Sequence, residues 1–131
     1  MRFLIVDDEF STRMILKEIL IRYGDCDICV NGQEALEAVT MSLDVNRPYD
    51  VVFMDVLMPV MGGLEAVTRI RDMESGRNII PKNSTKIVML SVVDEVKTVM
   101  DAFKKGEAVA YLIKPLDMDK LADTLQSIGI K

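Results

Sequence analysis

Short apolar runs alternate along the chain with longer segments in which apolar residues recur every three or four positions. The runs predict strands buried on both faces, because such strands carry no polar alternation, and the periodic segments predict amphipathic helices. The predicted strands are Arg2–Val6, Cys26–Val30, Val51–Met54, Lys86–Leu90 and Val109–Leu112, the last of which could extend to Ile113.

Helical segments occupy the intervals between these strands. Four apolar stripes mark helix faces, formed by Ile15, Leu16, Ile19 and Leu20, by Leu64, Val67 and Ile70, by Val96, Val99, Met100 and Phe103, and by Leu121, Ala122 and Leu125. Asn31 with Glu34 resembles the capping box of another helix, while Asp117 and Gly129 predict the start and end of the last one. The repeated βα order predicts an α/β fold with a parallel sheet covered by helices on both faces.

The segment Glu74–Thr85 lacks either pattern and is predicted to be an extended loop. Half of the 131 residues are hydrophobic, which suits one compact domain over residues 1–131.

The charge balance narrows the possible functions. The net charge is −5 and the sequence pI is about 4.7, whereas domains that bind the nucleic-acid backbone usually carry a basic face. The apolar start of the chain is too short for a signal peptide, and no segment has the length of a membrane span. We therefore expect a cytoplasmic protein with no direct nucleic-acid or membrane partner.

Cys26 and Cys29 form the only C-x-x-C pattern. In a strand, residues three apart point to opposite faces, so these two are poorly placed for a disulfide or a shared metal. The chain has no histidine and no second cysteine pair, which further disfavours zinc.

Polar residues follow the predicted strands at the edge where their carboxyl ends meet. Asp7–Glu9 follow the first strand, Asp55 the third, Ser91 the fourth and Lys114 the fifth. Ligand sites of open α/β sheets lie beyond this edge. Two carboxylates about 5 Å apart repel by roughly 3 kcal/mol at an effective dielectric near 20, so the cluster requires a cation. Mg²⁺ suits oxygen ligands of this kind and retains waters that a phosphate can replace.

With its charge balanced by a metal, an aspartate can attack a phosphoryl group as a nucleophile. The Lys114 ammonium and the Ser91 hydroxyl are suited to bind the transferred oxygens. The residues themselves therefore indicate phosphoryl chemistry at Asp55.

The arrangement resembles response-regulator receiver (CheY-like) domains, which accept phosphoryl groups in two-component signalling. The resemblance covers essentially the whole chain and rests on Asp7-Asp8, Met54-Asp55, Leu57-Met58-Pro59 with Gly62-Gly63, Met89-Leu90-Ser91 and Lys114-Pro115. It implies a doubly wound, flavodoxin-like (βα)5 fold with strand order 2-1-3-4-5. It also implies a signalling protein, not a conventional enzyme, that catalyses its own phosphorylation and dephosphorylation.

The resemblance assigns roles to individual residues. Asp55 is the expected phosphoacceptor, Asp8 a direct Mg²⁺ ligand and Asp7 a ligand through water, with the Leu57 backbone carbonyl as a further metal ligand. Mn²⁺ is expected to substitute for Mg²⁺. Ser91 and Lys114 are the expected catalytic partners of the phosphoryl group, Tyr111 reports the state of Ser91, and the Lys114-Pro115 bond is expected to be cis.

The resemblance also implies partners. Because the chain has no histidine, a separate histidine kinase or phosphotransfer protein must supply the phosphoryl group. Phosphorylation is expected to reshape the surface of the fourth helix, fifth strand and fifth helix, where a downstream protein or a second copy would bind. Ala102, Lys105, Ala110 and Tyr111 mark this surface.

Three apolar residues depart from the commoner receiver pattern. Leu57 replaces a residue that is often polar, Val92 replaces a smaller residue, and Val93 is also apolar. We hypothesise that they exclude water from the phosphoryl group, so that phosphorylated Asp55 persists for longer than usual.

Simpler interpretations exist for several of these residues. Asp7–Glu9 could form a solvated turn at a helix start, Ser91 could cap the fourth helix, and Tyr111 could be an ordinary strand aromatic.

At the level of the whole chain, the alternatives are a receiver cut from a larger regulator, an inert receiver used for docking, or a small phosphatase. A phosphatase of the aspartyl-phosphate type would instead carry D-x-D after the first strand, and a flavin-binding domain would carry a Ser/Thr/Gly-rich loop there.

Overall fold

The computed structural model describes residues 1–92, 96–105 and 107–130. Its five strands form one parallel sheet in the order β2-β1-β3-β4-β5, as predicted. The strands are β1 (Arg2–Val6), β2 (Asp25–Cys29), β3 (Val51–Asp55), β4 (Lys86–Ser91) and β5 (Ala110–Ile113).

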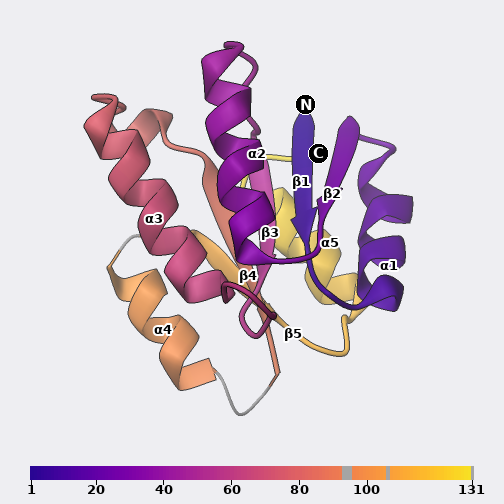
Figure 1. Ribbon diagram of the computed structural model, residues 1–131. Coiled ribbons are helices and arrows are strands. Elements are labelled where there is room, and N and C mark those ends of the chain that lie inside the picture. Colours follow the sequence, from indigo (N-terminus) through magenta and orange to yellow (C-terminus); the bar gives the residue numbers. More distant parts are fainter. Residues whose placement is uncertain (93–95, 106, 131) are drawn as a thin grey trace.

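Helices follow each strand and cover both faces of the sheet. They are α1 (Phe10–Leu20), α2 (Gly32–Asp44), α3 (Gly63–Gly76), α4 (Val96–Lys104) and α5 (Met118–Ser127), with a 3-10 turn η1 at Pro81–Asn83. Figure 1 shows α2 in front of the sheet and α5 behind it. Within the described residues, no helix combines the length and apolar character needed to cross a bilayer.

Side chains alternate across the central strands and build two cores. On one face, Met54 and Met89 pack with Val67 of α3 and Val99 of α4. On the other face, Phe53 and Leu90 belong to the cluster that α1 and α5 cover. Strands buried on both faces need an apolar residue at every position, which explains the unbroken apolar runs in the sequence.

The predicted helix ends are confirmed. The Asn31 side chain accepts a hydrogen bond from the Glu34 amide at 2.9 Å, and the Glu34 carboxylate accepts one from the Val30 amide at 3.0 Å. Because its amide is bonded to Glu34, Val30 belongs to the turn that precedes α2. The strand β2 therefore spans Asp25–Cys29 and not the predicted Cys26–Val30. Asp117 caps α5, and Gly129 follows that helix with a φ of +96°.

Two residues of the predicted helix stripes do not face the core. Ile15 is 41% exposed, whereas Leu16 and Leu20 are fully buried, because α1 presents the face that contains these two residues to the sheet. Ala122 is exposed as well, and α5 packs through Leu121 and Leu125.

The loop predicted over Glu74–Thr85 begins three residues later than expected, at Arg77, and contains a 3-10 turn. Helix α3 continues to Gly76, and Pro81–Asn83 form the 3-10 turn η1. Glu74 is buried and accepts a hydrogen bond from the Thr85 amide at 2.8 Å. The segment is therefore tied down by a side chain that local sequence patterns place on a loop.

Candidate functional site

The predicted site residues meet at the carboxyl edge of the sheet. Asp55 is the last residue of β3, Ser91 the last of β4, and Asp7 and Lys114 directly follow β1 and β5. The Lys114 amide donates a hydrogen bond to the Ser91 carbonyl at 2.7 Å, which holds the end of β5 beside β4. The Lys114-Pro115 bond is cis, as expected.

The Lys114 ammonium lies among three carboxylates. Its Nζ is 2.7 Å from Asp7 Oδ2, 3.2 Å from Asp55 Oδ1 and 3.2 Å from Glu9 Oε1. The side chains of Asp7 and Asp55 are 0% and 7% exposed, whereas that of Glu9 is 60% exposed. The lysine therefore joins two buried acids to one at the surface.

Burial and charge act together on Asp55. Burial, followed by the charge of Asp7, raises the pKa of the Asp55 carboxyl to about 7, although Lys114 acts in the opposite direction. Burial on its own would lower the pKa of Lys114, but the bonds and charges of Asp7 and Asp55 outweigh it and raise that pKa. One lysine does not balance the negative charges of these carboxylates. A further cation near Asp55 would therefore stabilise its ionised form.

The carboxylates fit a divalent metal. One oxygen from each of Asp7, Asp8 and Asp55 lies within 4.8 Å of the other two. Two hydrogen bonds hold Asp7 in place. Its Oδ1 accepts one from the Glu9 amide at 2.9 Å, and its backbone carbonyl accepts one from Arg13 Nη1 at 2.9 Å. An all-oxygen donor set with one exposed member, Asp8, suits Mg²⁺, which binds few carboxylates and keeps waters.

The interpretation of Asp7 as part of a solvated turn is wrong, because Asp7 is fully buried. Glu9 occupies the N-cap position of α1, but its side chain makes no cap hydrogen bond.

Ser91 contributes a hydroxyl at the floor of the site. The residue is fully buried, and its Oγ has no hydrogen-bond partner among the residues that the structure describes. Buried hydroxyls are normally paired, so this oxygen is suited to an incoming group. Ser91 is the last residue of β4, and residues 93–95, on which a capping role at the start of α4 depends, lie outside the described residues.

The β3–α3 loop brings the Asp55 backbone against the start of α3. The Gly63 amide donates to the Val56 carbonyl at 2.8 Å, and the Val56 amide donates to the Leu90 carbonyl at 3.1 Å. A Cβ atom at Gly63 would lie 1.9 Å from the Asp55 carbonyl oxygen. Only glycine fits this contact without a backbone shift, because 1.9 Å is far below the closest approach of carbon and oxygen.

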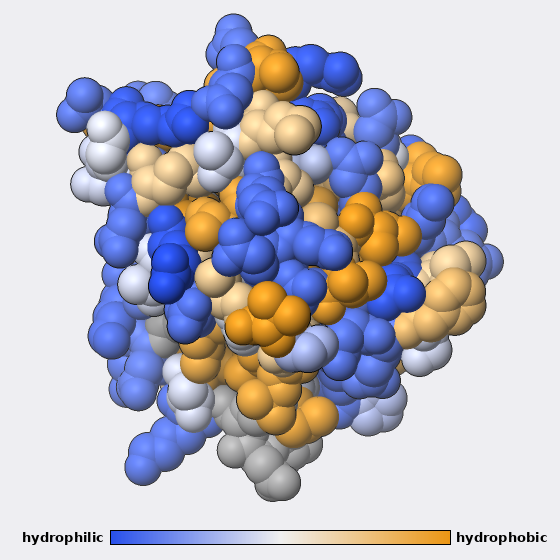
Figure 2. Space-filling view, viewed as in Figure 1, coloured by the Kyte–Doolittle hydropathy of each residue, from blue (hydrophilic) through white to orange (hydrophobic). Residues whose placement is uncertain are grey.

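Apolar side chains are exposed in the segments that directly follow β3 and β4. Leu57 is 69% exposed, Val60 82% and Val92 43%, while Val93 lies outside the described residues. Figure 2 shows apolar side chains gathered toward the lower edge of this face of the molecule, where the strands of Figure 1 end. Leu57 and Val60 both belong to the β3–α3 loop, which leads away from Asp55.

The predicted switch residue lies on the same face of the sheet as Ser91. Tyr111 pairs with Met89 in the register of β4 and β5, and Ser91 pairs with Ile113. Tyr111 is half-buried against the core on the α3 and α4 side. On the proposed output surface Lys105 is exposed and Ala110 half-buried, while the side chain of Ala102 lies outside the described part of the chain.

The two cysteines are separated as predicted. Cys29 is buried in the core beside α2, whereas Cys26 packs on the opposite face, and both thiols are free. Burial raises the pKa of the Cys29 thiol to about 12, so this thiol is protonated at neutral pH.

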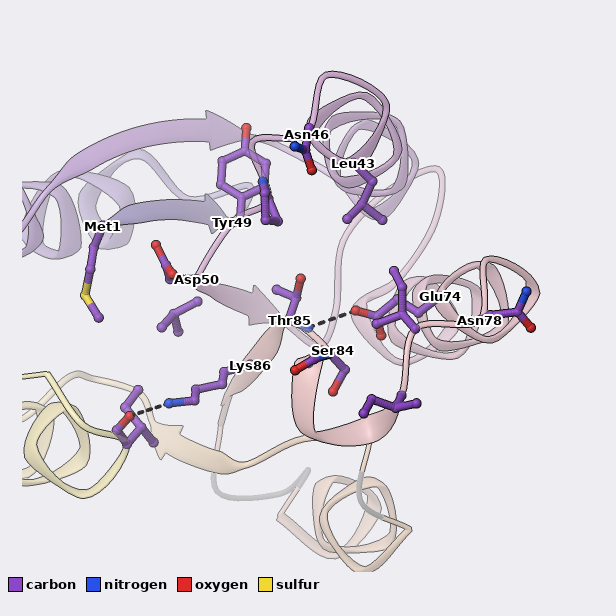
Figure 3. A pocket seen from close by; sticks show the side chains of 16 residues that line it. Met1, Leu43, Asn46, Tyr49, Asp50, Glu74, Asn78, Ser84, Thr85 and Lys86 are labelled. Atoms are coloured by element: carbon purple, nitrogen blue, oxygen red, sulfur yellow. Dashed lines mark hydrogen bonds between the residues drawn. The ribbon is translucent and has the colours of Figure 1, made fainter.

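A cavity lies at the opposite end of the sheet from the candidate site. It has a volume of about 580 Å³ and is lined by residues that include Leu43 near the end of α2, Glu74 near the end of α3 and Lys86 at the start of β4. Figure 3 shows Glu74 directed at the Thr85 amide. Lys86 Nζ donates a hydrogen bond to the Ile128 carbonyl at 2.7 Å. These bonds occupy the charged groups of Glu74 and Lys86, and none of the predicted site residues lines the cavity.

Sequence reasoning missed the contact between Glu9 and Lys114. The signal available was the position of Glu9 directly after Asp7-Asp8 at the end of a strand. Its side chain reaches Lys114, which follows it by 105 residues. Such a pairing depends on how the loops after β1 and β5 meet.

Comparison with known proteins identifies related chains. A model of the response regulator receiver domain matches residues 3–126. The chain is 35% identical over 132 residues to the sensory/regulatory protein RpfC of Xanthomonas campestris pv. campestris, covering 99% of this chain but only 17% of RpfC. The chain thus spans less than a fifth of that relative.

Solved structures also resemble this fold. A CheX–CheY–BeF₃–Mg²⁺ complex from Borrelia burgdorferi matches with a TM-score of 0.80 and 26% identity, covering 99% of this chain and 90% of that chain. A complex of the Saccharomyces cerevisiae histidine phosphotransfer protein Ypd1 with the receiver domain of Ssk1 matches with a TM-score of 0.78 and 26% identity, covering 98% and 88%.

Proposed function

The chain belongs to the response regulator receiver domain family, and we propose that it accepts a phosphoryl group on Asp55 in an Mg²⁺-dependent reaction. The donor is a phosphohistidine of a histidine kinase or a phosphotransfer protein. An Asp55 oxygen forms a bond to phosphorus as the phosphorus–nitrogen bond breaks. The electron pair of that bond stays on the histidine nitrogen, which then takes up a proton.

One observation carries this proposal. The carboxylates of Asp7, Asp8 and Asp55 gather within 4.8 Å at the carboxyl edge of the sheet, with the Lys114 ammonium 3.2 Å from Asp55. Asp55 can act as a nucleophile only when ionised, and Lys114 favours that form. The site thus holds a nucleophile together with the charges that balance a transferred phosphoryl group.

Asp7, Asp8, Asp55 and the Leu57 carbonyl are the proposed metal ligands. Bound Mg²⁺ would neutralise negative charge on the nucleophile and on the phosphoryl oxygens. Asp8 is exposed and is the proposed direct ligand, whereas the buried Asp7 is proposed to act through a water. Mn²⁺ should substitute, because it also prefers oxygen ligands.

Lys114 and Ser91 are the proposed partners of the phosphoryl oxygens. The ammonium lies beside Asp55, so it can follow the charge as it moves from the carboxylate to the phosphoryl group. The Ser91 hydroxyl has no partner within the described residues, so it can donate to a phosphoryl oxygen without breaking another bond there. Both groups therefore stabilise the phosphorylated state more than the free site.

This chain cannot supply a phosphohistidine of its own, because it contains no histidine. The matching Ssk1 receiver was crystallised with a histidine phosphotransfer protein. The exposed apolar side chains of Leu57 and Val60 beside the site are suited to such a contact, since large apolar side chains at a surface favour association.

The proposed output is a change in the surface of α4, β5 and α5. Phosphorylation replaces the single negative charge of the Asp55 carboxylate with a phosphoryl group that carries nearly two, which should draw Ser91 toward the phosphoryl group and open space for Tyr111. A downstream protein or a second copy would then bind near Tyr111 and Lys105. Partner binding that is equal in both states and survives Tyr111→Ala would exclude this output.

Incubation with acetyl phosphate and Mg²⁺, followed by intact mass spectrometry, tests the proposed phosphorylation. We expect one added phosphoryl group in the wild-type chain and none in Asp55→Asn or in the presence of a chelator. Asp50→Asn, at the other end of β3, is the matched control and should be phosphorylated normally. Continuous release of phosphate would instead indicate a phosphatase, and no gain of mass would indicate an inert docking module.

A further inference from the structure

Glu9 is an unusual residue for the start of α1. It occupies the N-cap position with extended backbone angles, yet its side chain makes no cap hydrogen bond. Serine, threonine, aspartate and asparagine are preferred at this position because their short side chains reach the first amides of the helix. Glutamate leaves those amides uncapped, so helix capping does not explain its presence.

The Glu9 side chain is directed to Lys114 instead. Its Oε1 accepts a hydrogen bond from the Lys114 Nζ at 3.2 Å. An ammonium group has three N–H donors, and three carboxylates lie within 3.2 Å of this one. In the unphosphorylated site the ammonium therefore lies at ion-pair distance from all three carboxylates and donates a hydrogen bond to Glu9.

A phosphoryl oxygen at Asp55 needs one of these donors. Asp7 is buried and loses its ion pair only at a high cost, because a buried carboxylate without a partner is strongly unfavourable. Glu9 is 60% exposed, so water can replace the lysine as its partner at little cost. Of the three contacts, the one to Glu9 is the easiest to release.

We propose that Glu9 is a positioning residue that holds Lys114 in the unphosphorylated site and is released when a phosphoryl group arrives. This inference rests on the proposed function of Asp55. Glu9 acts through Lys114 and touches no reacting atom. Because its contact exists only in the unphosphorylated state, it weakens binding of the phosphoryl group and sets how readily the site returns to its resting form.

Two substitutions test separately the length of the Glu9 side chain and its charge. Glu9→Gln keeps the length of the side chain and removes its charge, whereas Glu9→Asp keeps the charge and shortens the reach to Lys114. Glu18→Gln removes the same charge from an exposed position on the same helix and is the matched control. The probe is beryllofluoride, a phosphoryl analogue, titrated into each full chain at saturating Mg²⁺.

We expect both Glu9 variants to bind beryllofluoride about two- to fivefold more tightly, the range of an exposed ion pair, and Glu18→Gln to match the wild type. The ¹⁵N resonance of the Lys114 ammonium, recorded without beryllofluoride, should shift in both Glu9 variants only. Glu9→Asp should also raise the melting temperature, because aspartate can cap α1, whereas Glu9→Gln should not. Tighter beryllofluoride binding in both variants would therefore report on Lys114 and not on the stability of the helix.

Two results would overturn the inference. Unchanged or weaker beryllofluoride binding in both Glu9 variants, with a normal wild type, refutes the role of Glu9 and leaves the proposed function standing. Tighter binding in Glu9→Gln alone assigns the effect to net charge and not to the contact with Lys114. A wild-type chain that binds no beryllofluoride with Mg²⁺ refutes both the inference and the proposed function.

Discussion

The Glu74 carboxylate accepts a hydrogen bond from the backbone amide of Thr85 at 2.8 Å, across eleven residues of the chain. Its other oxygen pairs with Arg71 Nη1 at 2.7 Å, and Arg71 Nη2 donates to the Glu107 carbonyl at 2.8 Å. The side chain of Glu74 is 4% exposed. One buried carboxylate thus links the end of α3 both to the segment that enters β4 and, through Arg71, to the segment before β5.

Glu74→Ala should reduce the free energy of unfolding by about 2–4 kcal/mol, because it removes a buried charge-assisted bond and leaves the Thr85 amide unpaired. Urea denaturation measures the loss. Glu65→Ala is the control, since Glu65 pairs with Arg69 on the same helix and both side chains are 57% exposed. That change should cost less than about 1 kcal/mol. Equal losses in the two variants would contradict the structural role of Glu74.

Gly63→Ala should impair both stability and phosphorylation. The added Cβ would lie 1.9 Å from the Asp55 carbonyl oxygen, so the β3–α3 loop must shift at the nucleophile. We expect a loss of roughly 2 kcal/mol or more in unfolding free energy and slower labelling by acetyl phosphate.

Gly76→Ala is the matched control for that variant. A Cβ at Gly76, the last residue of the same helix, meets no atom within 4 Å. This alanine should leave labelling unchanged and should stabilise the chain by about 0.4–1 kcal/mol, through reduced entropy of the unfolded state. Slower labelling in both variants would show that the close contact at Gly63 is not the cause.

The contribution of Asp55 to stability, in the presence of a chelator, should fall as the pH rises from about 4 to 7. The pKa of Asp55 is raised to about 7 in the folded chain, first by burial and then by Asp7, from a value near 4 in the unfolded chain. Between these values the folded state binds more protons, so the contribution is complete below pH 4 and lost above pH 7.

Asp55→Asn isolates this effect because it lacks the titrating group. Relative to this variant, the wild-type chain should lose roughly 2–4 kcal/mol of unfolding free energy between pH 4 and pH 8. Added Mg²⁺ should reduce the loss, since a cation near Asp55 favours its ionised form. Parallel pH profiles of the two chains in chelator would refute a raised pKa at Asp55.

Leu57→Asn should accelerate the loss of the phosphoryl group from Asp55. Leu57 is 69% exposed in the loop beside the site, where a large apolar side chain can hinder the approach of water. Asparagine would instead hold a water close to the phosphoryl group by a hydrogen bond. Decay of phosphorylated chains, followed by intact mass after removal of the donor, measures the effect.

Val60→Asn changes an apolar side chain in the same loop and should have little effect on decay, which makes it the control. Loss of the wild-type phosphoryl group within seconds would contradict the long-lived state that Leu57, Val92 and Val93 are predicted to confer.

The sequence by itself determined the order of the elements and the edge at which the polar residues meet. Apolar runs such as Val51–Met54 identify strands because a doubly covered parallel strand has no polar face. Parallel strands place their carboxyl ends together, so the positions of Asp7, Asp55, Ser91 and Lys114 follow from the pattern alone.

Tertiary structure decided how those groups share their charges and which side chains are buried. Glu74 is buried although the sequence predicts a loop there, and Ile15 is exposed although it belongs to a predicted helix stripe. The hydrogen bond from Lys114 to Glu9 likewise joins residues 105 positions apart. Such outcomes depend on the reach of a side chain and on the packing of distant segments around it, and neither quantity is encoded in the spacing of neighbouring residues.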